Sequence, residues 1–313
     1  MPSGRFAPSP TGDLHLGNLR TALVAWLWAR HDSARFTLRI DDLDRVTSSE
    51  ANAVRQLDDL RSLGIDWDGD VERSSDHFDR YDAAIGRLEQ AGLVYRCYCT
   101  RREIAEAAAA PHGVVGRYPG VCRDLTESER ARREADGRRP ALRLRGTGRS
   151  VTFVDALAGP TTGVIDDVVL RRNDGVPAYQ LAVVVDDVAD GVELVVRGDD
   201  LLSSTPTQIH LAELLGWRSP GYAHVPLVLN HRGDRLAKRD GAVTLADRAA
   251  RGESVAATRT LLAASLGLCR RDQHIDLATL RSRFDPSRLP RTPWCLHEPG
   301  ATPGTRPSRR RRV

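Results

Sequence analysis

The feature that most constrains the fold is the N-terminal stretch RFAPSPTGDLHLGNLRTAL, from Arg5 to Leu23. Gly4–Ala7 has the pattern of a short strand that ends at a proline-rich turn, and leucines at helical spacing then predict a helix over about 15–29. The free N–H groups and the positive dipole end of such a helix face the turn. The stretch therefore predicts a phosphate site, in which His15 donates a hydrogen bond and Gly17 lets a nucleotide approach the backbone.

A simpler interpretation is a capped helix with an incidental histidine, so the elements that follow matter. Phe36–Ile40 alternates as a strand, and Thr47-Ser48-Ser49 offers caps for a second helix. The apolar face expected for that helix consists of Ala51, Val54, Leu57 and Leu60. This order of strands and helices predicts βαβ units, a parallel sheet and an α/β fold class.

The second half of the chain resumes the α/β pattern after an irregular segment. Val192–Val196 has the composition of a strand, and Thr205 and Pro206 are a cap and a first helical residue for a helix through Leu215. LAVVVDDVADG (181–191) fits either a strand or a helix. Between the halves, residues 95–145 combine cysteines, an alanine-rich helix, a Pro/Gly patch and a highly charged helix, which indicates an inserted module.

Length and composition indicate a globular chain with a real core. The 313 residues suit one large domain with an insertion, or two domains. The hydrophobic fraction of 41% and the charged fraction of 28% are ordinary. No apolar run approaches the roughly 18 residues of a membrane helix, and the N-terminus lacks a secretory signal pattern. We therefore expect a cytoplasmic protein that does not bind a membrane.

The formal net charge of +4 is a property of the C-terminal end. The stretch TRPSRRRRV carries five arginines and no acid, and the rest of the chain is slightly acidic without them. A nucleic-acid interface would then need a local basic patch, for which Arg101 and the stretch Arg130–Arg145 are candidates. The alternative for both is a solvated helix face.

The five cysteines point to a metal rather than to disulfides. An odd number in a cytoplasmic chain argues against a disulfide framework. Cys97, Cys99 and Cys122 lie close in sequence and offer three thiolates, whereas tetrahedral zinc needs four ligands. His112 is available as a fourth ligand, and the alternative is a set of free buried thiols. Cys269 and Cys295 have the character of ordinary cysteines.

Two distant motifs resemble the signatures of class I aminoacyl-tRNA synthetases. They are Leu-His-Leu-Gly at 14–17 and Leu-Ala-Lys-Arg at 236–239. Between them, LRIDDLDR (38–45) and the segments PAYQLAVVVDD and VVRGDDLLSSTPTQ within 177–208 are similar to the glutamyl-tRNA synthetase subgroup. These matches occur in the right order over most of residues 4–245.

The resemblance implies a division of the chain into five parts. A Rossmann-type catalytic domain is expected in two halves, 1–94 and 151–245, around a zinc-containing module at 95–150. A short helical subdomain (246–298) and a disordered basic tail (299–313) follow. Roughly 70 residues follow the second motif, which is too few for the helical anticodon-binding domains of a full glutamyl-tRNA synthetase.

The shortened architecture resembles the glutamyl-Q-tRNA(Asp) synthetases. That family activates L-glutamate with ATP and attaches it to the queuosine base in the anticodon of tRNA(Asp). If the anticodon itself enters the active site, no separate anticodon reader is needed. A minimal glutamyl-tRNA synthetase that charges tRNA(Glu), and an inactive relative that binds RNA or glutamate, are the alternatives. We expect a monomer.

The resemblance also implies roles for individual residues. Arginine forks suit the two carboxylates of glutamate, and Arg5 and Arg197 follow predicted strands whose carboxyl ends bind ligands in open α/β sheets. The expected glutamate-binding residues are Arg5, Ala7, Ser9, Asp41, Tyr179 and Arg197. Asp41 stands where relatives have glutamate, so either the pocket closes in or a water bridges the gap to the substrate ammonium.

The expected reaction joins glutamate to AMP before transfer to RNA. The glutamate α-carboxylate attacks the α-phosphate of ATP, which gives glutamyl-adenylate and pyrophosphate, and an RNA hydroxyl then attacks the adenylate. His15 and Gly17 bind the ATP phosphates on one side, and Lys238 and the Mg²⁺ of ATP act on the other. Arg235 and Ala237 replace a lysine and a serine of the second motif.

The resemblance adds a fourth ligand to the three cysteines. The family pattern Tyr-Pro-Gly-x-Cys makes Tyr118 that ligand, with His112 as the alternative. The expected set for one structural Zn²⁺ is Cys97, Cys99, Tyr118 and Cys122.

Overall fold

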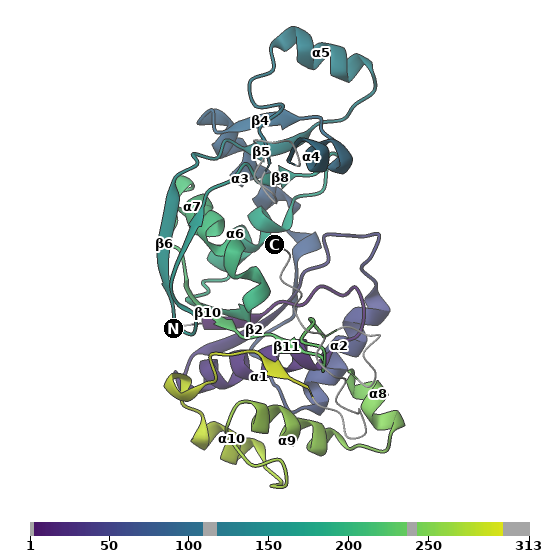
Figure 1. Cartoon of the computed structure of the whole chain (residues 1–313), viewed down its shortest axis with the longest axis vertical. Coiled ribbons are helices and arrows are strands. Elements are labelled where there is room, and N and C mark those ends of the chain that lie inside the picture. Colours follow the sequence, from purple (N-terminus) through teal and green to yellow (C-terminus); the bar gives the residue numbers. More distant parts are fainter. Residues whose placement is uncertain (1–2, 109–117, 237–242, 297–313) are drawn as a thin grey trace, which may run out of the picture.

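A five-stranded parallel sheet forms the centre of the computed structural model, which describes residues 3–108, 118–236 and 243–296 (Figure 1). In spatial order its strands are β10 (Gly221–Val225), β9 (Leu194–Gly198), β1 (Ser3–Phe6), β2 (Arg35–Ile40) and β3 (Glu72–Arg73). The predicted α/β class and the parallel sheet are confirmed. The strand expected at 192–196 begins two residues later.

Alternation along the strands gives the sheet two different faces. Phe6 and Phe36 point into the main apolar core, which helix α1 (Leu16–His31) covers. On the opposite face, Arg5, Arg39 and Arg197 make hydrogen bonds to side chains of the helices and strands that pack there. Three arginines on one face of a buried sheet are unusual, because charged side chains are rarely buried without partners.

Other helices lie on this second face and along the sheet edges. They are α2 (Glu50–Ser62), α3 (Phe78–Gln90), α6 (Tyr179–Ala189) and α7 (Thr205–Leu214), with the short 3-10 helices η1 (Ser74–Asp76) and η2 (Asp199–Ser204). The ambiguous segment 181–191 is thus mostly helix. Its apolar residues pack against α3 and α7.

The predicted apolar face of α2 is right at Leu57 and Leu60, which pack on the main core, and wrong at its first two positions. Ala51 and Val54 are exposed, whereas Ala53, Gln56 and Leu60 are buried. The physical reason is Gln56, whose amide donates to two carbonyls of the N-terminal turn and so rotates a polar residue inward. The N-cap is Ser49, one of the three cap candidates.

The inserted segment takes part in a separate antiparallel sheet, in the upper part of Figure 1, whose last strand comes from residues after the segment. The strands β4 (Val94–Cys97), β5 (Ala141–Leu144) and β8 (Val169–Arg171) pair in that order. Two charged helices, α4 (Arg101–Ala108) and α5 (Glu127–Ala135), lie between β4 and β5 in the chain, and α5 buries none of its residues. The hairpin β6 (Ser150–Asp155) and β7 (Gly159–Val164) then packs on α7 and β10.

The C-terminal elements are β11 (Val228–Leu229), α8 (Leu245–Ala250), α9 (Val255–Ser265), α10 (Leu277–Arg283), the 3-10 helix η4 (Pro286–Arg288) and β12 (Trp294–Cys295), which pairs with β11. Of these, α9 and α10 lie under α1 in Figure 1. The basic tail expected at 299–313 lies outside the described residues. Within the described part of the chain, every helix is too short or too polar to cross a membrane.

Candidate functional site

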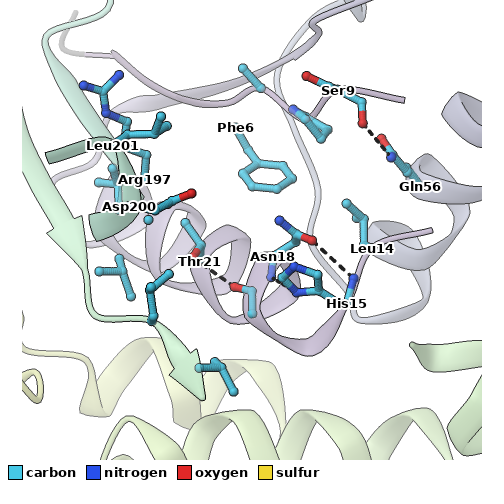
Figure 2. Close-up of a pocket in the computed structure, with 18 of the residues that line it drawn as sticks. Phe6, Ser9, Leu14, His15, Asn18, Thr21, Gln56, Arg197, Asp200 and Leu201 are labelled. Atoms are coloured by element: carbon cyan, nitrogen blue, oxygen red, sulfur yellow. Dashed lines mark hydrogen bonds between the residues drawn. The ribbon is translucent and has the colours of Figure 1, made fainter. Parts of the chain in front are cut away.

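A cavity of about 410 Å³ opens at the carboxyl ends of β1 and β9. Seven residues predicted to bind glutamate or ATP line it: Arg5, Ala7, Ser9, His15, Gly17, Tyr179 and Arg197. Figure 2 shows His15 and Asn18 on one side of this cavity and Arg197 and Asp200 on the other. The fold therefore brings together side chains that are far apart in sequence, at the edge where open α/β sheets bind ligands.

His15 caps helix α1 and lies against its first turn. Its Nδ1 accepts a hydrogen bond from the Asn18 backbone N–H at 3.2 Å, and the Asn18 side chain accepts from the His15 N–H. Because Nδ1 is the acceptor, the proton of the neutral ring is on Nε2. A Cβ on Gly17 would lie 2.8 Å from His15 Cε1, so glycine here makes room for the imidazole as well as for a ligand.

The turn before His15 is supported by a residue that the sequence did not reveal. The Gln56 side-chain amide donates to the carbonyls of Ser9 (3.1 Å) and Gly12 (2.6 Å). Gln56 is almost fully buried and also lines the cavity. The only sequence signal was one glutamine at a helical spacing from Ala53 and Leu60.

The second signature segment meets the first through its flanking residues. The Leu16 N–H donates to the Val243 carbonyl at 2.7 Å, and His15 forms an isolated bridge with Thr244. On the other side of the segment, Leu236 N–H donates to Val228 in β11. Lys238 and Ala237 lie outside the described residues.

Arg235 lies at the edge of the cavity in an ion pair. Its Nη2 is 2.8 Å from an Asp200 carboxylate oxygen, and both residues line the cavity. The pair joins the start of the second signature segment to η2, which directly follows β9. An arginine in place of the family lysine therefore already has a carboxylate partner in this chain.

Arg5 is paired with an acid inside the protein. Its Nε and Nη2 donate to the two carboxylate oxygens of Asp187 at 3.0 and 2.9 Å. Burial acts to raise the pKa of Asp187, but Arg5 and Arg39 hold that pKa below its usual range. The positive charge of Arg5 is thus largely balanced before any substrate binds. Asp187 was missed, although two acids inside the apolar run VVVDDV were the available signal.

Asp41 lines a second cavity, of about 360 Å³, which adjoins the first. Ser9 and Tyr179 line both cavities. Asp41 Oδ1 accepts from Arg39 Nε at 3.0 Å and from Ser74 Oγ at 3.1 Å. The structure therefore places Asp41 beside the first cavity rather than in its wall, with one carboxylate oxygen already used.

Arg39 is surrounded by acids. Its guanidinium lies within 3.5 Å of carboxylate oxygens of Asp41, Asp186, Asp187 and Asp190. Among the described residues, the three cations Arg5, Arg39 and Arg80 form ion pairs with these acids. Four ionised carboxylates therefore outnumber the cations next to the cavities. Such an excess suits a substrate that carries an ammonium group.

Arg197 differs from the other two arginines because its acceptors are neutral groups. Its Nε donates to His224 Nε2 at 3.1 Å, and its Nη2 donates to Thr205 Oγ1 and Gln208 Oε1. Its Nη1 is buried and has no hydrogen-bond partner among the described residues. Thr205 was expected to cap α7, but its hydroxyl contacts Arg197, and the N-cap residue is Ser204. A buried cation without an acid is an attractive site for a carboxylate ligand.

The cysteine cluster lies in the inserted segment. The sulfur atoms of Cys97, Cys99 and Cys122 all lie within 4.8 Å of one another, so they could hold a metal ion. The Tyr118 hydroxyl is 3.2 Å from the Cys97 sulfur and 3.5 Å from the Cys99 sulfur. His112 lies outside the described residues. None of the four clustered residues lines either cavity.

Tyr118 is held firmly beside the three sulfur atoms. Its hydroxyl accepts from the Cys122 N–H at 3.1 Å, and its own N–H donates to Asp166. The guanidinium of Arg143 lies 3.9 Å from the centre of its ring. Three thiols at these separations suit the sulfur ligands that zinc takes, and the Tyr118 hydroxyl is an oxygen atom close enough to be considered as a fourth.

Comparisons with known proteins identify the family of this chain. Residues 3–273 match the family described as tRNA synthetases class I (E and Q), catalytic domain. A glutamyl-Q tRNA(Asp) synthetase of Nocardia farcinica is 60% identical over 298 residues, which cover 95% of this chain and 94% of that protein. The corresponding protein of Symbiobacterium thermophilum is 46% identical over 307 residues, covering 94% of this chain and 95% of that protein.

A solved structure shows the same architecture. A glutamate tRNA ligase from Elizabethkingia meningosepticum, crystallised in complex with its amino acid, superimposes with a TM-score of 0.81. Its sequence identity to this chain is 26%, and the match covers 95% of this chain and 67% of that one. The similarity therefore extends over the catalytic part and the inserted segment of the structure.

Proposed function

Because the chain belongs to the class I synthetase family for glutamate and glutamine, we propose that it activates L-glutamate with ATP and transfers it to queuosine in the anticodon of tRNA(Asp). The observation that carries the proposal is that one cavity is lined both by the predicted phosphate site around His15 and by Arg197, which has an N–H group for a carboxylate that is unpaired in the part of the chain that the structure describes. The similarity to glutamyl-Q tRNA(Asp) synthetases over almost the full length of both proteins supports the choice of RNA.

Glutamate binding uses the charges on the second face of the sheet. Arg197 Nη1 donates to a substrate carboxylate, with Ser9, Ala7 and Tyr179 around it. Asp41 and the acid cluster behind it attract the substrate ammonium. Since Asp41 contributes to the adjoining cavity, a bridging water is compatible with its shorter side chain.

Adenylate formation uses the helix N-terminus. His15 Nε2–H and the positive dipole end of α1 stabilise charge that develops on the α-phosphate, and Gly17 leaves space for the nucleotide. Lys238 acts on the departing pyrophosphate, and the flanks of its segment at Leu236 and Val243 support this role. Mg²⁺ that arrives with ATP neutralises phosphate charge. Positioning and electrostatics account for the rate, and no side-chain nucleophile is needed.

The metal that we propose for the cysteine cluster is a structural Zn²⁺. Cys97, Cys99, Cys122 and Tyr118 would hold it, and a saturated tetrahedral site leaves no open position for catalysis. The ion would join the start of the inserted segment to the loop before α5. We propose a cytoplasmic monomer, as expected from the sequence.

The decisive experiment supplies labelled glutamate and ATP with three RNAs. These are tRNA(Asp) with queuosine, the same tRNA with guanosine at that position, and tRNA(Glu). We expect label on the queuosine-containing tRNA only. Label on tRNA(Glu) alone would contradict the proposal and identify a minimal glutamyl-tRNA synthetase. The absence of glutamate-dependent ATP–pyrophosphate exchange would leave an inactive binding protein.

A further inference from the structure

We infer that His224, oriented by Asp155, is a positioning residue that holds Arg197 in its substrate-binding orientation without neutralising its charge. The inference rests on the proposed function, because it concerns how the same cavity recognises a carboxylate. Neither His224 nor Asp155 lines the cavity, so both act through Arg197.

The sheet register places the histidine beside the arginine. Arg197 in β9 and His224 in β10 are direct partners in the parallel ladder, so their side chains leave the same face of the sheet. His224 Nε2 is 3.1 Å from Arg197 Nε, and His224 Nδ1 is 2.6 Å from Asp155 Oδ2 in β6. The side chains of His224 and Asp155 are fully buried, so water does not compete for these contacts.

The hydrogen-bond pattern fixes the tautomer of the imidazole. Arg197 Nε can only donate, so His224 Nε2 must accept, and the ring proton must be on Nδ1. That proton is donated to Asp155, which therefore selects the correct tautomer. Burial lowers the pKa of His224, although Asp155 opposes this effect. The ring thus remains a neutral acceptor.

Asp155 is itself held in place by the backbone. Its Oδ1 accepts from the N–H groups of Leu157, Ala158 and His224, at 2.9, 2.8 and 3.1 Å. The carboxylate therefore has one oxygen anchored in the β6–β7 turn and the other directed at the imidazole. A rigid carboxylate fixes the ring, and the fixed ring fixes the guanidinium.

The remaining contacts of Arg197 are also made by neutral groups. Thr205 and Gln208 accept from Nη2 at 2.8 and 2.6 Å, and the guanidinium lies 5.3 Å from the centre of the Tyr222 ring. Arg5, in contrast, is held by the carboxylate of Asp187. Had an acid stood in place of His224, it would have neutralised Arg197. Because all these partners are neutral, the substrate carboxylate supplies the missing negative charge. A substrate with a neutral amide in place of that carboxylate would leave the Arg197 cation unpaired.

The first test is Asp155→Asn. Its amide N–H would face His224 Nδ1 and favour the other tautomer, which points an N–H at the N–H of Arg197. We expect the KM for glutamate in ATP–pyrophosphate exchange to rise about tenfold or more, with little change in the KM for ATP. The relative rate with glutamine should rise, because the orientation of Arg197 is loosened.

A matched pair at His224 separates positioning from folding. His224→Gln can place an amide oxygen near the Nε2 position and so keep an acceptor for Arg197, whereas His224→Asn can reach only Asp155. We expect His224→Gln to retain a glutamate KM within a few-fold of the wild type and His224→Asn to behave like Asp155→Asn. Thermal unfolding of each variant shows whether it is folded.

The outcomes distinguish this inference from the proposed function. If the wild type supports no glutamate-dependent exchange, the proposed function fails. If the wild type is active and folded Asp155→Asn and His224→Asn keep the wild-type glutamate KM, the positioning role is wrong. Equal rises in the KM for glutamate and for ATP would also overturn it, because they would indicate a general loss of structure.

Discussion

At the scale of single residues, the two arginines of the cavity have different electrostatic situations. Arg5 is balanced by Asp187, whereas Arg197 has only neutral partners among the described residues. Sequence position alone makes them equivalent, since each is the second-last residue of a parallel strand. The difference arises from the helix opposite each strand, and it assigns the arginines different contributions to stability and binding.

Methionine substitutions test this difference, because methionine fills space without charge. Arg5→Met leaves the buried Asp187 with only Arg39, so we expect the free energy of unfolding to fall by about 3 kcal/mol. Arg197→Met removes a cation that has no acid partner, so we expect a much smaller loss of stability but a large rise in the glutamate KM. Urea unfolding and ATP–pyrophosphate exchange measure the two effects. Equal losses of stability would refute the distinction.

His15 has two separable roles, in the helix cap and toward phosphate. His15→Asn retains a side-chain acceptor for the Asn18 N–H, while His15→Ala loses both the cap and the ring. We expect both variants to lose adenylate formation by about a hundredfold or more. Only His15→Ala should also lose about 1 kcal/mol of stability. Retained activity in a folded His15→Asn variant would show that the ring does not act on phosphate.

At the scale of elements, the zinc proposed for the cysteine cluster predicts that the stability of the inserted segment depends on the cluster. We expect Cys122→Ser to lose bound zinc and to lower the unfolding temperature, because a structural zinc site contributes directly to folding. Tyr118→Phe should weaken zinc binding, and His112→Ala should leave it unchanged. Metal content after dialysis against a chelator measures this. Zinc lost from His112→Ala and kept by Tyr118→Phe would reverse the choice of the fourth ligand.

The elements show what the sequence could predict and what it could not. Leucines at helical spacing predicted α1, alternation predicted β2, and the start signal of Thr205 and Pro206 predicted α7, each nearly to its observed ends. Periodicity gave only half of the apolar face of α2, because Gln56 is buried by hydrogen bonds to a turn distant in sequence. Periodicity also could not decide whether 181–191 is a strand or a helix, since a helix that is buried all round has no polar face.

Sequence analysis predicted the site residues that belong to a motif. It missed the residues that only hold a motif residue in place. The motifs led to His15 and Arg197 but not to Asp155 or His224, which come from strands with unremarkable sequences. Their importance depends on the pairing of β9 with β10 and on the packing of the β6–β7 hairpin. Such long-range placement leaves no local pattern in the sequence.

At the scale of the whole molecule, a buried charge cluster joins the two halves of the catalytic domain. Arg39 comes from β2, in the half before the inserted segment, and Asp186, Asp187 and Asp190 come from α6 or its end, in the half after it. Ser74 and Tyr81 of the first half also donate to Asp186. The cluster therefore links substrate recognition to the assembly of the domain.

The ionisation of Asp186 should make the stability of the folded protein depend on pH. Burial raises its pKa to about 6, although Arg39 and the hydrogen bonds of Tyr81 and Ser74 oppose the shift. Because the folded pKa lies above the unfolded value of about 3.9, the contribution to stability is full below that value and is lost as pH rises through about 6. The wild type should lose about 1 kcal/mol from this group between pH 5 and pH 8.

The variant Asp186→Asn isolates this group from all others. Asparagine keeps an acceptor for Tyr81 and cannot ionise, so the variant does not share the loss. The other titrating groups are common to both proteins and largely cancel in the difference. We therefore expect the stability of Asp186→Asn relative to the wild type to increase by about 1 kcal/mol from pH 5 to pH 8, as measured by urea unfolding. A difference that does not change with pH would mean that Asp186 is ionised throughout, and that Arg39 outweighs its burial.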